Sequence, residues 1–464
     1  MAAGGTLVAG SVLATAGVTS EGMAEADLEE PTGWSSSGGN PGNARYLPVD
    51  GEFPEPERVA WEYDQGGDIA VVDGRVYVCT TVSEGLPEVH ALDAADGSVQ
   101  WVSEELPVDE TPAVAGDTVY VGGEQLSALD AADGSVRWTR EFEVDDPTVS
   151  SPTVIYGRVY TVANGTLYAL DPADGSTDWK RETAEIPDEE EEPRPLETEP
   201  VAVAGEQVYA VTADKEKVAA FDAATGETAW TSSTGETIRG PATATEQAVY
   251  IRSHAGYESL AFDPETGETS KIKGWGPAAA TGEIRASYDE MGVYVSHLER
   301  GWNDMRGTSR EYGDGGSVTI IGDTLVVTTA TIWGQGETAY GFDLEDGTRR
   351  WDVPSKEDGI DVYKVQAVDE ETLYDYGRDL PQPGGDRIRA LRPAETDEGD
   401  DDAGDDRDRE DEGEDGDQNE DDNDESETDS GDGREDGSSG DDPDGGDGAD
   451  DSVEDDAPDE DEVC

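Results

Sequence analysis

One eleven-residue pattern, beginning with Ala or Gly and usually ending in Trp, recurs along the chain and constrains its fold more than any other feature. The spacings between successive copies are 37, 41, 51, 41 and 80 residues, and the last gap spans two periods. The six copies are ALDAADGSVQW (91–101), ALDAADGSVRW (128–138), ALDPADGSTDW (169–179), AFDAATGETAW (220–230), AFDPETGETSK (261–271) and GFDLEDGTRRW (341–351). Repetition near 40 residues indicates a solenoid, a propeller or a similar array.

A second kind of apolar strand, often with a Val-Tyr core, occurs eight times along the chain. Its copies are residues 75–81, 117–123, 158–164, 207–213, 248–254, 292–298, 323–330 and 371–377. Strands alternate with tight turns, and no helical periodicity interrupts them. Each period is therefore predicted to contain four strands: a short first strand, the Val-Tyr strand, a third strand ending near the motif Asp, and a fourth ending in Trp.

Each position of the eleven-residue pattern has a physical reason. The Asp and the Asp-Gly or Thr-Gly pair suit a tight hairpin turn, in which Gly supplies the positive φ. The Trp is large enough to reach the neighbouring sheet, and the leading Ala or Gly leaves room for such a ring. The Trp residues are therefore predicted to be structural rather than catalytic. They are Trp61, Trp101, Trp138, Trp179, Trp230 and Trp351.

The two ends of the repeat region complement each other. Residues 58–64 read as a fourth strand without the three that should precede it, whereas residues 371–393 supply strands without a fourth. Counting fourth-strand ends at the six Trp residues, at Lys271 and near Tyr312 gives eight. The sequence thus predicts an all-β fold, an eight-bladed β-propeller with four-stranded blades and velcro closure, over residues 34–393.

The charge of the chain is extreme, with 112 acidic residues against 30 basic ones and a net charge of −82. Residues 394–464 contribute −35, so the rest of the chain still carries −47. At about 1 M salt the Debye length falls to about 3 Å, which screens such self-repulsion. The composition is typical of extreme halophiles, an acidic mesophilic protein being the alternative. It also argues against nucleic acid and anionic membranes as partners.

The ends of the chain differ in composition from the repeats. Residues 1–20 form a signal-like apolar leader, similar to the second half of a twin-arginine signal, with an unstructured leader as the alternative. The apolar run is short for a membrane span, so an exported mature chain without a span is expected. Residues 394–464 are predicted to be a disordered Asp/Glu-rich tail. Cys79, in an apolar run, is expected to be a small buried side chain.

The pattern A-x-D-x-x-T/D-G-x-x-x-W resembles the tryptophan-docking repeat of pyrroloquinoline-quinone (PQQ) β-propellers. Residues 33–48, GWSSSGGNPGNARYLP, are similar to the W…GGNxxN segment of their secreted, haloarchaeal-type relatives. The family includes quinoprotein dehydrogenases, which bind the quinone and Ca²⁺, and non-enzymatic scaffolds resembling BamB. The dehydrogenases typically place an adjacent Cys pair against the quinone, whereas Cys79 stands alone.

The resemblance implies an exported, non-enzymatic binding or scaffold propeller with no cofactor, acting at the cell surface or outside the cell. A PQQ- and Ca²⁺-dependent alcohol or sugar dehydrogenase is the alternative. The chain is expected to be a monomer, with an unidentified protein or cell-surface component as its partner.

The least regular stretch, residues 271–312, is the candidate site. It balances six basic and six acidic residues in an otherwise very negative chain, and aromatic residues lie among them. The basic ones are Lys271, Lys273, Arg285, Arg300, Arg306 and Arg310. Arg beside aromatic residues is common at binding hot spots. Arg300, Trp302, Arg306 and Arg310 are therefore predicted to form a ligand or partner surface, with a drifted, internally paired blade as the alternative.

Overall fold

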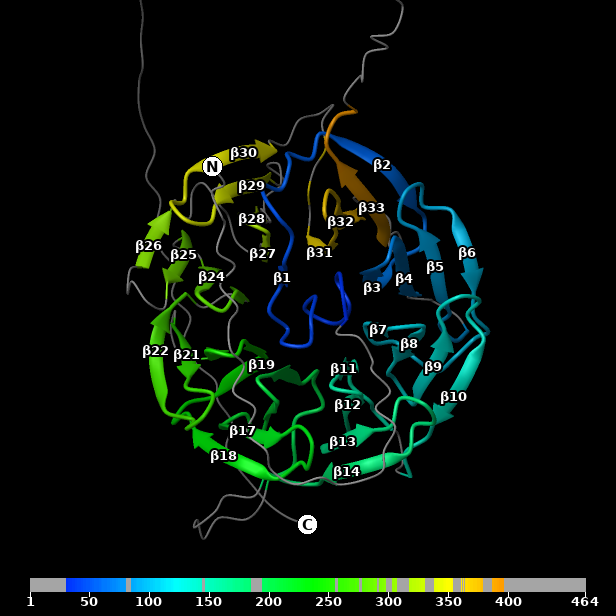
Figure 1. Cartoon of the computed structure of the whole chain (residues 1–464), viewed down its shortest axis with the longest axis vertical. Coiled ribbons are helices and arrows are strands. Elements are labelled where there is room, and N and C mark those ends of the chain that lie inside the picture. Colours follow the sequence, from blue (N-terminus) through cyan, green and yellow to red (C-terminus); the bar gives the residue numbers. More distant parts are fainter. Residues whose placement is uncertain are drawn as a thin grey trace, which may run out of the picture. The chain divides into compact units, whose positions relative to one another are not determined.

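The computed structural model describes residues 31–395, apart from 81–84, 144–146, 185–193, 255–257, 275–277, 290–291, 298–302, 307–316, 330–337, 354–359, 361, 363 and 379–385. The described residues form eight antiparallel sheets arranged as blades around a ring (Figure 1). The predicted all-β, eight-bladed propeller with four-stranded blades is confirmed. The described part of the chain contains no helix with the length and apolar character needed to cross a bilayer. The predicted leader and almost all of the predicted tail lie outside the described residues.

Blades 1 to 4 each consist of four consecutive strands. Blade 1 contains β3 (Gly67–Val72), β4 (Arg75–Thr80), β5 (Val89–Asp93) and β6 (Val99–Val102). Blade 2 contains β7 (Ala113–Ala115), β8 (Thr118–Val121), β9 (Leu126–Asp130) and β10 (Val136–Arg140). Blade 3 contains β11 (Thr153–Ile155), β12 (Arg158–Ala163), β13 (Thr166–Leu170) and β14 (Thr177–Arg181). Blade 4 contains β15 (Ala202–Ala204), β16 (Gln207–Val211), β17 (Lys217–Asp222) and β18 (Thr228–Ser233).

Blades 5 to 8 complete the ring, and the last two include strands from the start of the chain. Blade 5 contains β19 (Ile238–Ala244), β20 (Val249–Ser253), β21 (Glu258–Phe262) and β22 (Thr269–Lys273). Blade 6 contains β23 (Ala278–Ala280), β24 (Ile284–Asp289), β25 (Gly292–His297) and β26 (Asn303–Arg306). Blade 7 contains β27 (Ser317–Ile321), β28 (Thr324–Thr329), β29 (Thr338–Asp343) and β30 (Arg349–Val353), with β1 (Tyr46–Leu47) added. Blade 8 contains β31 (Val365–Val368), β32 (Leu373–Arg378), β33 (Asp386–Arg392) and β2 (Arg58–Tyr63).

Blade 8 closes the ring as predicted, because the N-terminal strand β2 pairs antiparallel with the C-terminal strand β33. In this pairing Trp61 lies opposite Ala390, the same Trp–Ala pairing that blades 1 to 4 make within one hairpin. The closure joins strands more than 300 residues apart in sequence, so neither end of the ring is left as a free edge.

Blade 6 corrects one prediction. Residues 292–298 were predicted to be a second strand, but β25 is the third strand of its blade, and β24 takes the second place. The reason is that the Val-Tyr pair is typical of a strand packed on both faces, and in blade 6 this pair lies on the third strand, β25, rather than on the second. The predicted fourth-strand end near Tyr312 lies outside the described residues, and the fourth strand is β26.

Each docked Trp joins its blade to the next. In blade 3, Trp179 Nε1 donates a 3.1 Å hydrogen bond to the carbonyl of Ala223 in blade 4, and the ring lies against Gly226. The other bonds run from Trp61 to Ala94 (2.9 Å), Trp101 to Ala131 (3.0 Å), Trp138 to Pro172 (2.9 Å), Trp230 to Pro264 (2.8 Å) and Trp351 to Phe53 (3.1 Å). A Cβ on Gly226 would lie 2.5 Å from the Trp179 ring, so the motif Gly serves the docking as well as the turn.

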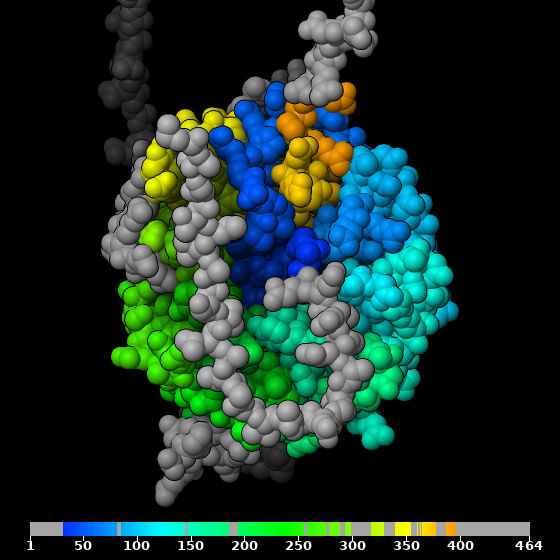
Figure 2. Space-filling model, in the orientation of Figure 1, coloured from blue at the N-terminus to red at the C-terminus, as the bar shows by residue number. Residues whose placement is uncertain are grey.

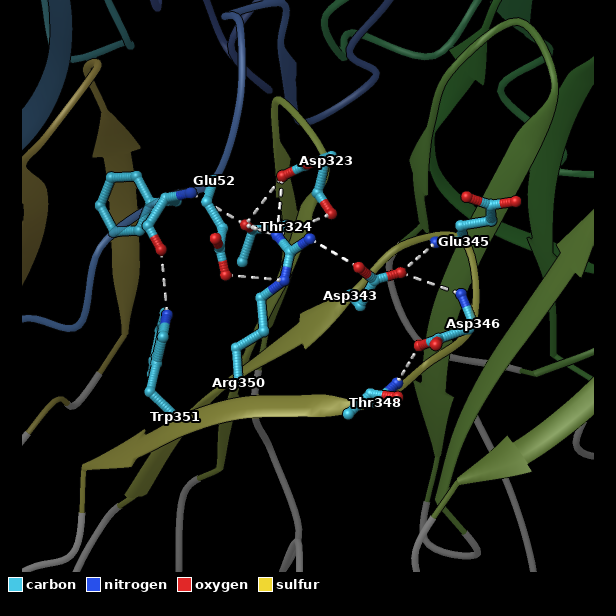
Figure 3. A network of polar contacts seen from close by, with 10 residues as sticks. Glu52, Asp323, Thr324, Asp343, Glu345, Asp346, Thr348, Arg350 and Trp351 are labelled. Carbon is cyan, nitrogen blue, oxygen red and sulfur yellow. Dashed lines mark hydrogen bonds and ion pairs between the residues drawn. The ribbon is translucent and has the colours of Figure 1, made fainter.

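Blade 7 reaches the closing blade through a polar network around Arg350 (Figure 3). Arg350 Nη1 donates to Asp323 Oδ1 at 2.7 Å, and Nη2 donates to Asp343 Oδ2 at 2.6 Å. Its Nε lies 3.1 Å from Glu52 Oε1, in the segment that leads into β2. In the same segment, the carbonyl of Phe53 accepts the Trp351 indole N–H, in place of the hairpin carbonyl used elsewhere.

The segment 34–47 lies in the middle of the ring, where Figures 1 and 2 show it in blue. Its backbone bonds in turn to the innermost strands of six blades, which joins these blades to one another through a single stretch of chain. One of these contacts falls on each of β3, β7, β15, β19, β23 and β27. In that order they are Trp34 with Val71, Ser35 with Val114, Pro41 with Val203, Gly42 with Ala244, Ala44 with Ala280 and Arg45 with Ile320.

Candidate functional site

A cavity of about 220 Å³ lies between blade 5, blade 6 and the central segment 34–47. The residues lining it are Ser37, Gly38, Asn43, Arg45, Pro241, Thr243, Tyr250, Ile251, Arg252, Ser259, Ala278 and Arg285. Three of these are arginines and none is acidic, although the chain has nearly four acidic residues for every basic one. The lining is thus cationic in a strongly anionic protein.

Arg285 is the most buried charge in the cavity wall, with 1% of its surface exposed. From β24 its Nη1 donates to the Lys273 carbonyl at 2.9 Å, and its Nη2 donates to Ser259 Oγ at 3.0 Å and to the Gly274 carbonyl at 3.2 Å. These partners are neutral, and Nε has no hydrogen-bond partner among the described residues. Burial lowers the pKa of Arg285 to about 10, which still leaves the guanidinium charged at neutral pH.

Tyr250 contributes a second unsatisfied donor. It lies on β20 and is 3% exposed, and its hydroxyl has no hydrogen-bond partner among the described residues. The Arg285 guanidinium lies over the Tyr250 ring, 5.5 Å from its centroid, which is a cation–π geometry. Burial raises the pKa of Tyr250, so its hydroxyl keeps its proton and remains a donor.

Tyr250 packs against a different partner from the Tyr at the equivalent position of other blades. In five of the other blades the equivalent Tyr packs against the docked Trp of its own blade, with ring centroids about 6 Å apart. The pairs are Tyr77–Trp101 (6.0 Å), Tyr120–Trp138 (5.9 Å), Tyr160–Trp179 (6.0 Å), Tyr209–Trp230 (6.0 Å) and Tyr374–Trp61 (5.9 Å). Blade 5 has Lys271 where the Trp would stand, and its Tyr packs against an arginine of the next blade instead.

The loss of Trp also changes the hairpin of blade 5. Where a Trp is present, a bulge shifts the register so that Trp faces the leading Ala or Gly, as Trp179 faces Ala169. In blade 5 the register is regular, and Ala261 faces Ser270 instead. Lys271 is left exposed, with Nζ 3.1 Å from Glu236 Oε1 and 3.5 Å from Glu258 Oε2.

The other two arginines of the cavity are anchored by further contacts. Arg45 donates from Nε to the Val318 carbonyl at 2.7 Å and from Nη2 to the Val365 carbonyl at 3.1 Å, and it lies over the Trp34 ring. Arg252 is half-buried on β20, and its charge opposes the burial that raises the pKa of Glu199. Both side chains therefore bring fixed positive charge to the cavity.

The cavity does not fit the cofactors of a quinoprotein. Ca²⁺ takes six to eight oxygen ligands, rich in carboxylates, whereas three guanidinium groups line this cavity. Elsewhere, the described residues contain no group of three or more His, Cys, Asp or Glu side chains placed to hold a metal ion. The volume of about 220 Å³ is also below the range of about 300–1,000 Å³ of pockets for drug-sized ligands.

The predicted surface at residues 299–310 falls largely outside the described residues. This holds for Arg300, Trp302 and Arg310, whereas the Arg306 backbone lies in β26 opposite Val293. The cavity instead uses Arg285 from the same irregular stretch. Arg45, Tyr250 and Arg252 were missed, and the signal that could have found Tyr250 was the loss of Trp from its blade. Cys79 is buried and free, as expected, and burial raises its pKa.

The closed ring and its Trp-bearing hairpins define the chain as an eight-bladed β-propeller of tryptophan-docking repeats. It belongs to the PQQ-repeat family whose model is described as outer membrane protein assembly factor BamB, which matches residues 87–192 and 188–374. No curated protein matches the sequence.

Solved structures share the fold at low sequence identity. Quinohemoprotein alcohol dehydrogenase ADHIIG from Pseudomonas putida HK5 aligns with a TM-score of 0.54 and 16% identity, covering 78% of this chain and 80% of that one. A europium-containing methanol dehydrogenase gives 0.55 and 13%, covering 79% and 99%. The computationally designed Ika8 protein gives 0.54 and 14%, covering 73% and 100%. At these identities the likeness shows the fold alone.

Proposed function

We propose that this protein is an exported, non-enzymatic binding propeller of an extreme halophile, which holds a ligand or partner rather than transforming it. The observation that most supports this is how the middle of the ring is occupied. The chain's own segment 34–47 lies there and bonds to the inner strands, and a small cationic cavity remains beside it. A ring with a small, cationic pocket beside its central segment suits recognition.

The chemistry of the cavity lining supports binding. General acid–base catalysis needs a group whose pKa lies near the working pH. The pKa of Arg285 is about 10 and that of Tyr250 is raised above its ordinary 10, so both hold their protons at neutral pH. Such groups orient and neutralise a ligand.

Export and a halophilic source are parts of the same proposal. The leader-like residues 1–20 and the net charge of −82 support them. Raising KCl from about 0.1 M to about 1 M shortens the Debye length from about 10 Å to about 3 Å. The thermal midpoint of the full chain should therefore rise steeply over that range, and a midpoint independent of salt would contradict the halophilic assignment.

The competing function, quinone-dependent dehydrogenation, can be tested directly. The full chain is incubated with PQQ and Ca²⁺ in molar salt, and dye reduction is followed with a panel of alcohols and sugars. The proposal expects no reduction above that of the same mixture without protein. Reduction that is saturable in substrate and needs both PQQ and protein would overturn it.

A further inference from the structure

The interface between blades 5 and 6 buries a positive charge, that of Arg285, without a carboxylate among its hydrogen-bond partners. Arg285 donates three hydrogen bonds, to two carbonyls and a hydroxyl, none of which carries charge. Burying a charge without pairing is strongly unfavourable. Burial depresses the pKa of this arginine, and no carboxylate acts to raise it. Arg285 therefore brings a buried positive charge to the site without a charged hydrogen-bond partner.

Two buried donors are also unused at the same place. Arg285 Nε and the Tyr250 hydroxyl lack partners among the described residues, and both residues line the cavity. Buried polar groups are nearly always hydrogen-bonded in native proteins, and an exception calls for an explanation. A negatively charged ligand with oxygen acceptors would satisfy both donors and neutralise the charge of Arg285.

The equivalent groups at the interface of blades 3 and 4 are hydrogen-bonded or packed. At the interface of blades 3 and 4, Tyr160 packs on Trp179 and donates its hydroxyl to the Ala223 carbonyl at 3.0 Å. In blade 5, which lacks the Trp, the Tyr250 hydroxyl has no hydrogen-bond acceptor among the described residues. The Arg285 guanidinium packs against the Tyr250 ring where a Trp ring packs in blade 3. The unused donors thus lie at an interface where the repeat has lost its Trp.

The size and lining of the cavity limit the class of ligand that it can hold. A volume of about 220 Å³ equals about seven water molecules at about 30 Å³ each, which is far more than a halide needs and little for a tricyclic quinone. Apolar groups of Pro241, Ile251 and Ala278 stand beside the charged ones. We propose that this cavity binds a small organic carboxylate, with its carboxylate on Arg285 and Tyr250 and its short apolar part against Ile251 and Ala278. This inference rests on the proposed binding function and names its ligand class.

The test uses the full chain in about 1 M KCl, in a buffer free of carboxylates, with propionate, butyrate and benzoate as probes. Isothermal titration should give a dissociation constant at or below about 1 mM for at least one probe, within what ligands of this size can reach. The matching amides, propionamide, butyramide and benzamide, should bind at least tenfold more weakly, because they lack the charge that Arg285 needs. Equal binding of acids and amides would overturn the proposal, as would no binding of any acid.

Variants locate the binding. Arg285→Gln removes the charge and should weaken binding at least tenfold, since hydrogen bonds to charged groups are the stronger ones. Tyr250→Phe keeps the ring and should weaken binding by a smaller factor. Tyr160→Phe, which deletes a buried hydroxyl at the equivalent position of blade 3, is the matched control and should bind as the parent does. Unchanged affinity in Tyr250→Phe would overturn the assignment even if Arg285→Gln fails to fold.

The two proposals fail in different ways. Quinone-dependent dye reduction would overturn the non-enzymatic function whatever the titrations give. Absence of carboxylate binding, with no dye reduction, would remove only the ligand class. Binding of the acids that survives intact in Tyr250→Phe would place the ligand elsewhere on the protein and so overturn the cavity assignment alone.

Discussion

The interface between blades 3 and 4 and the interface between blades 5 and 6 come from the same repeat but are held together differently. At the first, Trp179 packs on Gly226 and bonds to Ala223. At the second, Lys271 stays exposed, and Arg285 reaches back to Tyr250 and to backbone carbonyls of blade 5. The difference teaches that a repeat can give up one docking residue when the ring supplies other contacts, and that the vacated interface then differs chemically from the rest.

The largest effect should come from removing a docked ring. Trp179→Ala should lower the free energy of unfolding by about 3–5 kcal/mol, since a buried ring and its hydrogen bond are lost together. Lys271→Ala, at the equivalent position of blade 5, should change it by less than about 1 kcal/mol, because the Lys is exposed and its ion pairs are screened. Urea unfolding at one high salt concentration measures both, and similar losses would contradict the comparison.

A methyl group on the motif Gly should have the next largest effect. Gly226→Ala places a Cβ 2.5 Å from the Trp179 ring at φ +68°, so overpacking of about 1–3 kcal/mol adds to the strain of a positive φ. Gly235→Ala is the matched control, because its φ is +67° and nothing lies within 4 Å of the added Cβ. The difference between the two variants in thermal or urea unfolding isolates the contact with Trp.

Restoring the missing Trp should have little effect. Lys271→Trp should shift the free energy of unfolding by no more than about 0.5 kcal/mol, as for an ordinary surface substitution. The reason is that in blades 1 to 4 and 8 the docked Trp combines a bulge in its own hairpin with a Gly turn in the next blade, and the blade 5 hairpin lacks the bulge. A stabilisation of several kcal/mol would show that the ring alone restores the interface.

A small, pH-dependent effect concerns the Arg that precedes Trp in blade 2. Arg137 Nη1 donates to Asp117 Oδ1 at 2.7 Å, and this bond lowers the pKa of Asp117 from 3.8 to about 2. A depressed pKa in the folded state stabilises the protein above the unfolded value, near 3.8, and this stability is lost as pH falls through about 2. Arg137→Gln should therefore be less stable than the parent above pH 3.8, by less than about 1 kcal/mol for an exposed pair.

Urea unfolding across this pH range measures the difference for Arg137→Gln, which should shrink toward zero at the acid end. Gln100 occupies the same position in blade 1, so Gln100→Ala is the control and should show no such pH dependence. A constant difference for Arg137→Gln at all pH values would mean that its contribution is packing rather than charge.

Most of the fold could be predicted from local sequence because each blade repeats the same short-range rules. The Asp-Gly turn, the Val-Tyr strand and the closing Trp predicted the hairpins, the eight blades and the pairing of β2 with β33. The strand order of blade 6 was predicted wrongly because the prediction relied on the same local pattern. There the motif is degenerate, and the Val-Tyr pair moved to the third strand without any local signal that it had done so.

The cavity could not be predicted, because its parts come from segments that the ring brings together. Arg45, Tyr250 and Arg285 are separated by up to 240 residues, and nothing near any of them in sequence marks it as a neighbour of the others. The sequence by itself determined the repeat, its hairpins and the place where the pattern lapses, since these depend on neighbouring residues. The tertiary structure decided what fills that lapse, because the burial of Arg285 and its closeness to Tyr250 exist only once blades 5 and 6 pack around the central segment.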